Sequence, residues 1–233
     1  MKKAFILLFL LPIIGMAQKP LLDTTQMPNA VYYLPAPPDN TSAAFQYDKA
    51  QYRWGKEQRK DSTSLAIAVH DAVWTIETVC SAFSEPFGLT ISKEGTPAIY
   101  KLIAATCASV DQAGVLAKAR YMRTRPYVYY NEPTIYPSDE EDLRTNGSYP
   151  SGHTIRGWST ALILTEINPD RADTILARGF LFGENRVIAG YHWQSDVDAG
   201  RLVASAAIAR LHADKEFLHL MEAAKKEFEK LTR

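Results

Sequence analysis

The spacing of apolar residues is the feature of this sequence that most restricts its fold. From Ala43 onward, apolar residues recur at intervals of three and four, and sustained two-residue alternation, which is typical of strands, is nearly absent. We therefore predict an all-α fold, organised as a single-domain helical bundle. The spacing predicts helices over 44–59, 63–84, 95–122, 152–167, 170–189, 195–212 and 214–231.

Residues 1–17 have the features of a cleaved signal peptide. Lys2 and Lys3 precede a short apolar run, and small residues at Gly15 and Ala17 suit a signal-peptidase site. The run is shorter than the roughly 20 residues that span a bilayer, and no other segment of the sequence is long and apolar enough. We therefore predict an exported protein, periplasmic or secreted, with no membrane as a partner.

Composition divides the rest of the chain into an arm and a domain. Residues 18–45 are rich in Pro, Asp and Asn and are expected to form an extended N-terminal arm, followed by an all-α domain over 46–233. Without the signal peptide the chain has a small excess of acidic residues, which argues against nucleic acid as a partner. Cys80 and Cys107 could form one disulfide in an oxidising compartment, and the sequence leaves that open.

The segment GSYPSGHT, residues 147–154, opens one of the predicted helices. Ser151 is a suitable N-cap, so local structure alone could account for the segment. The same helix N-terminus would also present the backbone N–H groups of Gly152 and His153 to an anion, and His153 could transfer a proton. The segment by itself does not decide between these interpretations.

The segment KARYMRTRP contains the second group of candidate residues. Lys118 and Arg125 stand seven residues apart, or two helical turns, so we expect both on one face of a helix that ends before Pro126. Arg120 and Arg123 fall on other faces and are expected in a solvated basic helix end.

The segment NRVIAGYHWQSDVDAGR contains the third group. Ser195 is predicted as a helix N-cap with Asp198 as its capping-box partner, which leaves Asp196 in the first turn. An Asp four residues after His192 could hold the Nδ1 atom and leave Nε2 as an acceptor or nucleophile. A single His–Asp pair is more often structural, but a second histidine at a helix entrance favours a functional site.

Together the three segments supply what phosphoryl transfer needs. Lys118, Arg125 and Arg186 are charge-assisted donors, and the planar fork of arginine matches phosphate oxygens. A phosphoryl group in flight spreads its charge over the equatorial oxygens, so fixed positive donors are the main requirement. Two imidazoles on opposite sides of the phosphorus could serve as nucleophile and acid without a metal.

These motifs and their order resemble the three-part signature of the type 2 phosphatidic acid phosphatase (PAP2) superfamily. The matching residues are Lys118, then Arg125–Pro126, then PSGH at 150–153, then Arg186, His192 and Asp196. The segments YYLPAPPDNTSAAF, YMRTRP, NGSYPSGHT, EINPDR and VIAGYHWQSDVDAGR are similar to those of class A bacterial non-specific acid phosphatases. Three spaced motifs in order are far more specific than any one of them.

The resemblance implies an all-α, exported, metal-independent acid phosphatase without a cofactor. Its substrates would be a broad range of small phosphomonoesters, with inorganic phosphate as product, and the balance between hydrolysis and phosphoryl transfer to other alcohols stays open. Several members of the family are homo-oligomers, and we expect one here.

The resemblance also assigns roles to residues. It implies that His192 is the nucleophile that forms a phosphohistidine, that Asp196 orients it, and that His153 protonates the leaving group. The implied phosphate-binding residues are Lys118, Arg125, Ser151, Gly152 and Arg186. Because His192 must be neutral and His153 protonated, activity should show a bell-shaped pH dependence. Asn185 stands where the family usually has Ser, and we expect it to modify the surroundings of the site without abolishing activity.

Two other functions fit parts of the pattern. A vanadate-dependent haloperoxidase shares the anion pocket by family resemblance, because vanadate resembles phosphate in shape and charge. A non-catalytic phosphate-binding protein would use the cations and helix N-termini but has no need of two histidines and an Asp. A serine hydrolase is disfavoured because Ser151 lacks the G-x-S-x-G elbow.

The remaining polar features are expected to be structural or to set substrate preference. His70 and Asp71 lack the further ligands of a metal-dependent hydrolase, so His70, His212 and His219 are expected in packing or on the surface. The polar stretch over 126–150 is long for a loop, which favours a functional role. Its acidic run over 139–142 is expected to disfavour highly charged phosphates such as polyphosphate.

Overall fold

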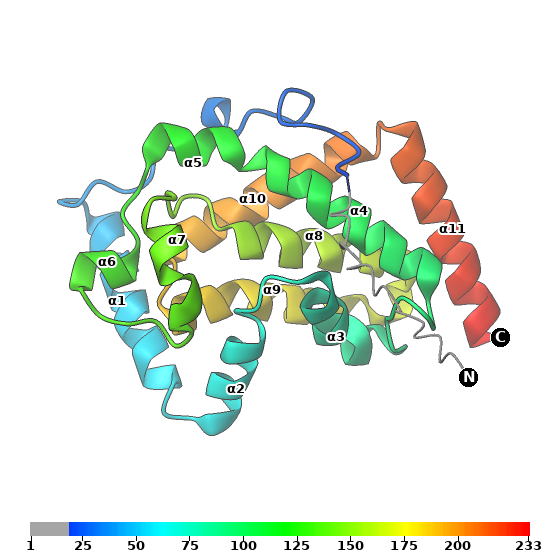
Figure 1. The fold of residues 1–233 in the computed structure, drawn as a ribbon, viewed down its shortest axis with the longest axis horizontal. Coiled ribbons are helices and arrows are strands. Elements are labelled where there is room, and N and C mark those ends of the chain that lie inside the picture. The colour runs from blue at the N-terminus through cyan, green and yellow to red at the C-terminus, as the bar shows by residue number, and fades with distance from the viewer. Residues whose placement is uncertain (1–18) are drawn as a thin grey trace, which may run out of the picture.

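The structure, a computed structural model, describes residues 19–233, and the statements below concern that part of the chain. The predicted signal peptide over 1–17 lies outside the described residues. All regular structure in the described part is helical, which confirms the predicted all-α, single-domain fold (Figure 1). The α-helices are α1 (Ala43–Gln58), α2 (Ser62–His70), α3 (Ile76–Phe87), α4 (Pro97–Ala113), α5 (Val115–Tyr121), α6 (Pro126–Tyr130), α7 (Glu140–Arg144), α8 (Gly152–Ile167), α9 (Ala172–Ala189), α10 (Gln194–Leu211) and α11 (Lys215–Thr232).

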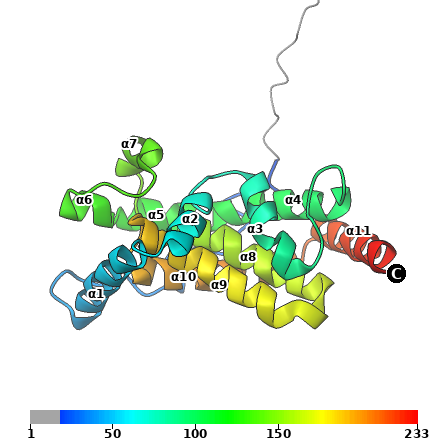
Figure 2. The same ribbon diagram turned by 90° about the horizontal axis from the view of Figure 1, so that it is seen from below.

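Helix α8 lies at the centre of the bundle. It packs against α9 and α10 on one side and α4 on the other, and Figure 2 shows α4 and α9 on opposite sides of α8. The amphipathic α11 covers α4 and part of α8 with a face that includes the buried Phe217 and Met221. Helices α6 and α7 lie with α5 on the side of the bundle away from α9.

The central helices touch almost through their backbones. A Cβ atom at Gly157 on α8 would lie only 2.6 Å from the ring of Phe182 on α9, so only glycine allows this approach. Gly200 plays the same part between α10 and the first turn of α8, where an added Cβ would lie 2.9 Å from Thr154. Helix α9 runs antiparallel to α8, and α10 runs antiparallel to α9. This packing therefore brings the start of α8, the end of α9 and the start of α10 to one end of the bundle.

Two of the predicted helices are interrupted. The helix expected over 63–84 is divided into α2 and α3 by the turn 71–75, because Asp71 leaves the helix to accept hydrogen bonds from Arg178 and Asn185 in the core. The helix expected over 95–122 is divided at Gly114, and α5 ends at Tyr121, where Met122 adopts a left-handed conformation with φ of 39°.

The segment before α1 and the segment before α8 contain little helix. Residues 19–42 carry one 3₁₀ turn, Ala30–Tyr32, and lie along the domain with Leu22, Met27 and Leu34 buried. The stretch over 126–150 contains the short helices α6 and α7 separated by a 3₁₀ turn, so it is not a structureless loop. No helix in residues 19–233 is long and apolar enough to cross a membrane.

The two cysteines lie on neighbouring helices and are free thiols. Cys80 is on α3 and Cys107 on α4, and both side chains are buried. Burial raises the pKa of the Cys80 thiol to about 12 and that of the Cys107 thiol to about 11, so both are protonated and unreactive at neutral pH.

Candidate active site

A cavity of about 460 Å³ opens where the ends of α8, α9 and α10 meet α5 and the 126–150 segment. All but two of the predicted site residues line it: Lys118, Arg125, Gly152, His153, Arg186 and His192. Ser151 and Asp196 do not line the cavity and lie behind its wall, fully buried. Residues that are distant in the sequence are thus collected into one pocket, as the motifs predicted.

His192 enters the cavity from the connection between α9 and α10. Gly190 ends α9 in a left-handed conformation, with φ of 87°, and turns the chain so that His192 lies beside the start of α10. The ring is 2 % exposed. Its Nε2 lies 3.2 Å from Nη1 of Arg125, and its Nδ1 lies 3.4 Å from Oδ2 of Asp196. Because Arg125 can only donate, Nε2 is the acceptor, so the neutral ring carries its proton on Nδ1. Asp196 lies within ion-pair distance of that atom, although Nδ1 makes no hydrogen bond within the described residues.

His153 occupies the first turn of α8 and is also buried. Its Nε2 lies 3.1 Å from the carbonyl oxygen of Ala72, which can only accept, so Nε2 carries a proton and Nδ1 is left for a second one. The ring packs against the indole of Trp74 at a centroid distance of 4.4 Å. The turn after α2 therefore both orients His153 and places an aromatic wall beside it.

Three cations surround the two histidines. Lys118 on α5 donates to the carbonyl of Gly147 at 2.9 Å. Arg125, which precedes α6, donates through Nε to the carbonyls of Leu143 and Asn146. Arg186 near the end of α9 is 1 % exposed, and its Nε and Nη1 have no partner in the described part of the chain. A buried guanidinium with unused donors on the wall of a cavity is suited to bind an anion.

Lys118 and Arg125 reach the cavity differently from the prediction. They were expected on one face of a single helix, but α5 ends at Tyr121 and Arg125 lies in extended backbone before α6. The left-handed Met122 reverses the chain, so the two side chains converge from separate elements. The expected proximity is correct, although the helical reason for it is wrong.

Burial beside like charges lowers the pKa values of these groups. Burial lowers the pKa of His192 well below its ordinary value, and Arg125, Lys118 and Arg186 lower it further. The pKa of His153 is lowered in the same way, by burial and then by Arg186. Burial also lowers the pKa of Lys118 to about 7 and that of Arg186 to about 10. The cavity therefore favours a bound anion that offsets this excess of positive charge.

Ser151 and Asp196 hold the walls of the cavity. Ser151 caps α8 as predicted, because its Oγ accepts from the N–H of Thr154, and its own N–H donates to the carbonyl of Asp196 at 2.9 Å. The predicted cap of α10 is wrong: the N-cap is Trp193, and Asp196, not Asp198, accepts from the N–H of the cap residue at 2.8 Å. This geometry turns the Asp196 carboxylate toward His192.

Sequence reasoning missed two residues beside the site. Arg123 was expected in solvent, but its side chain is 8 % exposed and donates to Asp196 at 2.6 Å and to Asp48 on α1 at 2.7 Å. Asp48 carried no motif and is completely buried. Their partners lie more than 70 positions away along the chain, so no local pattern could have identified them.

Asn185, which stands where the resemblance predicts Ser, lies behind the site. Its Nδ2 donates to Oδ2 of Asp71 at 2.7 Å, and Asp71 also accepts from Arg178 at 2.6 Å. Asp71 precedes Ala72, whose carbonyl accepts from His153. His70 was expected in packing or on the surface, and its ring bridges Asp71 and Ser81 at the edge of this cluster.

Comparisons with known proteins identify the family of this chain. The profile of the PAP2 superfamily matches residues 98–217, which include every residue named on the cavity wall except Trp74. The chain therefore belongs to the PAP2 superfamily. A non-specific acid phosphatase of Providencia stuartii is 44 % identical to this chain over 214 residues. The aligned residues cover 90 % of this chain and 85 % of the Providencia protein. A non-specific acid phosphatase of Salmonella typhimurium is 40 % identical over 222 residues, which cover 92 % of this chain and 88 % of the Salmonella protein.

An acid phosphatase of Zymomonas mobilis is 41 % identical over 199 residues, which cover 85 % of this chain and 75 % of its own. Within the superfamily, the chain is thus an acid phosphatase of the class A non-specific type. The family expected from the motifs is confirmed.

Proposed function

We propose that this acid phosphatase hydrolyses phosphomonoesters through a phosphohistidine at His192, without a metal or cofactor. The observation that carries the proposal is the pairing of two buried histidines in one cavity with opposite proton arrangements. His192 directs an Nε2 lone pair toward Arg125, whereas His153 has its Nε2 proton engaged by Ala72 and can take a second proton on Nδ1. One ring is suited to attack and the other to donate.

The proposed reaction has two steps. In the first, Nε2 of His192 attacks phosphorus, the bond from phosphorus to the ester oxygen breaks, and protonated His153 gives its Nδ1 proton to that oxygen, which leaves as an alcohol. In the second, water attacks phosphorus, the bond from phosphorus to Nε2 breaks and leaves His192 neutral, His153 takes a proton of that water, and inorganic phosphate is released. A second alcohol in place of water would give phosphoryl transfer.

Each remaining residue has a part in these steps. Lys118, Arg125 and Arg186 would bind the phosphoryl oxygens, together with the N–H groups of Gly152 and His153 at the start of α8. Ser151 would contribute through its hydroxyl, because its N–H already donates to the carbonyl of Asp196. A bound phosphoryl group would take the Arg125 donor away from Nε2 of His192 and free the lone pair for attack. Its negative charge would also raise the pKa of His153, which burial keeps low, so that the ring is protonated when substrate is present.

The cavity also suggests a substrate preference. Asp139 and Asp142, from the acidic run of the 126–150 segment, also line the cavity. We expect these carboxylates to repel leaving groups with several negative charges, so kcat/KM should be lower for polyphosphate than for a simple monoester. Asp139→Asn and Asp142→Asn should each bring the kcat/KM for polyphosphate closer to that for the monoester. Equal or higher kcat/KM on polyphosphate in the native protein would contradict this preference.

We further propose that the protein is exported after cleavage near Ala17 and that it forms a homo-oligomer, as several members of the family do. Cell fractionation with N-terminal sequencing of the mature chain would test export. Light scattering of the purified protein would test the oligomer.

The decisive experiment is hydrolysis of p-nitrophenyl phosphate in EDTA, across pH, by the native protein and His192→Ala. We expect turnover that resists the chelator, has a bell-shaped pH profile, and falls by at least about 10³-fold in the variant while inorganic phosphate still binds. Activity that EDTA abolishes would overturn the metal-free mechanism, and an active His192→Ala would overturn the phosphohistidine. Halide oxidation with added vanadate and peroxide, without phosphatase activity, would instead indicate a haloperoxidase.

A further inference from the structure

The carboxylate of Asp196 is shared between His192 and a group outside the cavity. Its Oδ2 faces Nδ1 of His192 at 3.4 Å and accepts from the N–H of Trp193 at 2.8 Å. Its Oδ1 accepts from Nη1 of Arg123 at 2.6 Å, the shortest of the three contacts. The charge behind His192 is therefore not that of an isolated carboxylate.

Arg123 is itself held in place by α1. Its Nη2 donates to Oδ2 of Asp48 at 2.7 Å, and its Nη1 donates to Oγ of Ser195 at 2.8 Å. Asp48 is completely buried and also accepts from the N–H of Ser195 at 2.9 Å and from its hydroxyl at 2.7 Å. Asp48 thus caps the start of α10 from a helix 147 positions earlier in the chain, where the indole of Trp193 cannot act as a cap.

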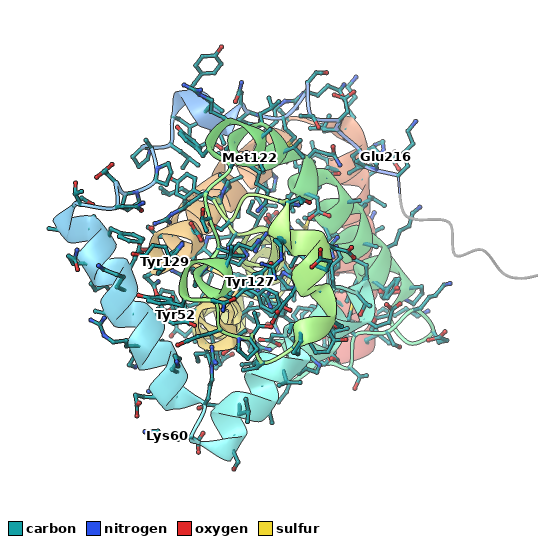
Figure 3. All side chains as sticks on the ribbon, turned by 60° about the vertical axis from the view of Figure 1, so that its left-hand side comes forward. Tyr52, Lys60, Met122, Tyr127, Tyr129 and Glu216 are labelled. Atoms are coloured by element: carbon teal, nitrogen blue, oxygen red, sulfur yellow. The ribbon has the colours of Figure 1, made fainter. Side chains whose placement is uncertain are left out.

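Aromatic side chains cover this ion-pair network. The Arg123 guanidinium lies 5.9 Å from the ring of Phe45 and 5.6 Å from that of Trp193. Tyr129 packs edge-on against both rings at 5.6 Å, and Figure 3 looks at this end of the molecule, with Tyr52 and Tyr129 labelled where α1 and α6 meet. Asp48 and Asp196 are completely buried and the Arg123 side chain is 8 % exposed, so the charges interact more strongly here than they would at the surface.

We propose that Arg123 and Asp48 are positioning residues for phosphoryl transfer, which hold Asp196 against His192 and balance its negative charge. When His192 carries positive charge in the phosphohistidine, the charges alternate in sign from His192 through Asp196 and Arg123 to Asp48. Arg123 offsets part of the Asp196 charge, so that His192 stays neutral and able to attack. Asp48 offsets part of the Arg123 charge, so that Asp196 still stabilises the positive ring of the phosphohistidine. This inference rests on the proposed role of His192.

The alternation predicts opposite effects of removing its two outer members. The charged and titratable groups that face His192 are Lys118, Arg125, Arg186, His153 and Asp196. Without Arg123, the Asp196 charge is less compensated, and His192 should take up a proton at higher pH. Without the Asp48 charge, Arg123 offsets Asp196 more fully, and His192 should take up that proton at lower pH.

The test compares the pH profile of kcat/KM for p-nitrophenyl phosphate in the native protein, Arg123→Met and Asp48→Asn. We expect the acidic limb to move up by about one pH unit in Arg123→Met and down by about half a unit in Asp48→Asn. In both variants kcat should fall about 10–100-fold, while the inhibition constant of inorganic phosphate changes less than about twofold, because neither residue touches the cavity. Substrate ionisation is common to all variants and cancels in the comparison.

Two further variants guard against a purely structural effect. Arg120→Met removes an exposed arginine three residues away and should leave the profile, kcat and the phosphate inhibition constant unchanged. Arg123→Lys keeps the charge, but one ammonium cannot contact Asp48, Ser195 and Asp196 together, so it should shift the limb in the direction of Arg123→Met by a smaller amount. If Arg123→Met does not fold, Arg123→Lys and Asp48→Asn still provide the opposite shifts.

The outcomes separate this inference from the proposed function. Shifts of the same sign, or no shift, in folded Arg123 and Asp48 variants would overturn the positioning role, even if His192→Ala were inactive. An active His192→Ala would overturn the phosphohistidine itself. A loss of phosphate binding that accompanies the loss of kcat would show that these residues support the whole fold of the site and not His192 in particular.

Discussion

His192 and His153 both lie at helix entrances on the same cavity, but the groups behind the two rings differ in charge. His192 faces the carboxylate of Asp196, whereas His153 donates to the neutral carbonyl of Ala72. In the proposed reaction His192 gains positive charge as it bonds to phosphorus, and a carboxylate behind it stabilises that charge. His153 must give up its proton, and a neutral carbonyl holds a protonated ring less strongly than a carboxylate would.

The two sides also differ in how they are anchored. The His192 side depends on ion pairs that cross the molecule to α1, through Arg123 and Asp48. The His153 side depends on a turn whose Asp71 is bound by Arg178 and Asn185. We infer that the proton affinity of the nucleophile depends on neighbouring charges, whereas that of the acid depends on the position of a backbone carbonyl. Mutations of the anchoring residues should therefore affect one histidine without affecting the other.

The largest expected effect on the acid side is that of His153→Ala. Because an ester with a good leaving group needs little protonation, kcat should fall about 10³-fold on an alkyl phosphate but only about tenfold on p-nitrophenyl phosphate. Steady-state rates of both substrates at the pH optimum would measure this difference. His192→Ala is the matched control, since loss of the nucleophile should affect both substrates equally. An equal loss on both substrates in His153→Ala would contradict its role as the acid.

How far these two sides could be predicted from the sequence differs as well. The helices, the cations and both histidines follow local rules of spacing and motif order, and the structure brings them to one cavity. The anchors do not, because Asp48 and Asp71 act through partners 70 or more positions away. The N-cap of α10 is Trp193 and not the predicted Ser195 for the same reason, since Asp48 on α1 accepts from the N–H of Ser195. The break between α2 and α3 follows from the burial of Asp71, which no periodicity reveals.

A smaller effect should appear in the pH dependence of stability. The pKa values of His153 and His192 are lowered in the folded protein, so below about pH 6.5 the unfolded chain binds protons that the folded protein does not. The free energy of unfolding should therefore fall with decreasing pH, with a limiting slope of about 1.4 kcal/mol per pH unit for each ring. Urea unfolding between pH 7.5 and 5.5 would measure this slope.

Two controls isolate the contribution of the histidines. His153→Gln and His192→Gln should each reduce the slope, because each removes one ring that titrates differently in the two states. Inorganic phosphate should stabilise the native protein more at pH 5.5 than at pH 7.5, since the bound anion favours protonated rings. A slope that is unchanged in both variants would contradict the lowered pKa values.

The smallest expected effect is that of Asn185→Ser, which introduces the residue usual in the family. Serine is too short to keep the 2.7 Å hydrogen bond to Asp71, but Arg178 still pairs with that carboxylate. The free energy of unfolding should fall by about 1.5–2 kcal/mol, the low end of the range for a hydrogen bond to a charged group, because Asp71 keeps its pairing with Arg178. Because Asp71 supports the turn that orients His153, the activity on alkyl phosphates should fall about two- to threefold more than on p-nitrophenyl phosphate.

This leaving-group dependence distinguishes the two sides of the site in a variant that stays active. Urea unfolding and the rates on both substrates measure it, with the exposed Asn40→Ser as a control that should change neither. If Asn185 acted instead through its neighbour Arg186, the inhibition constant of inorganic phosphate would rise and the two substrates would be affected equally. That result would place Asn185 with the phosphate-binding residues and remove the proposed link between Asp71 and the acid.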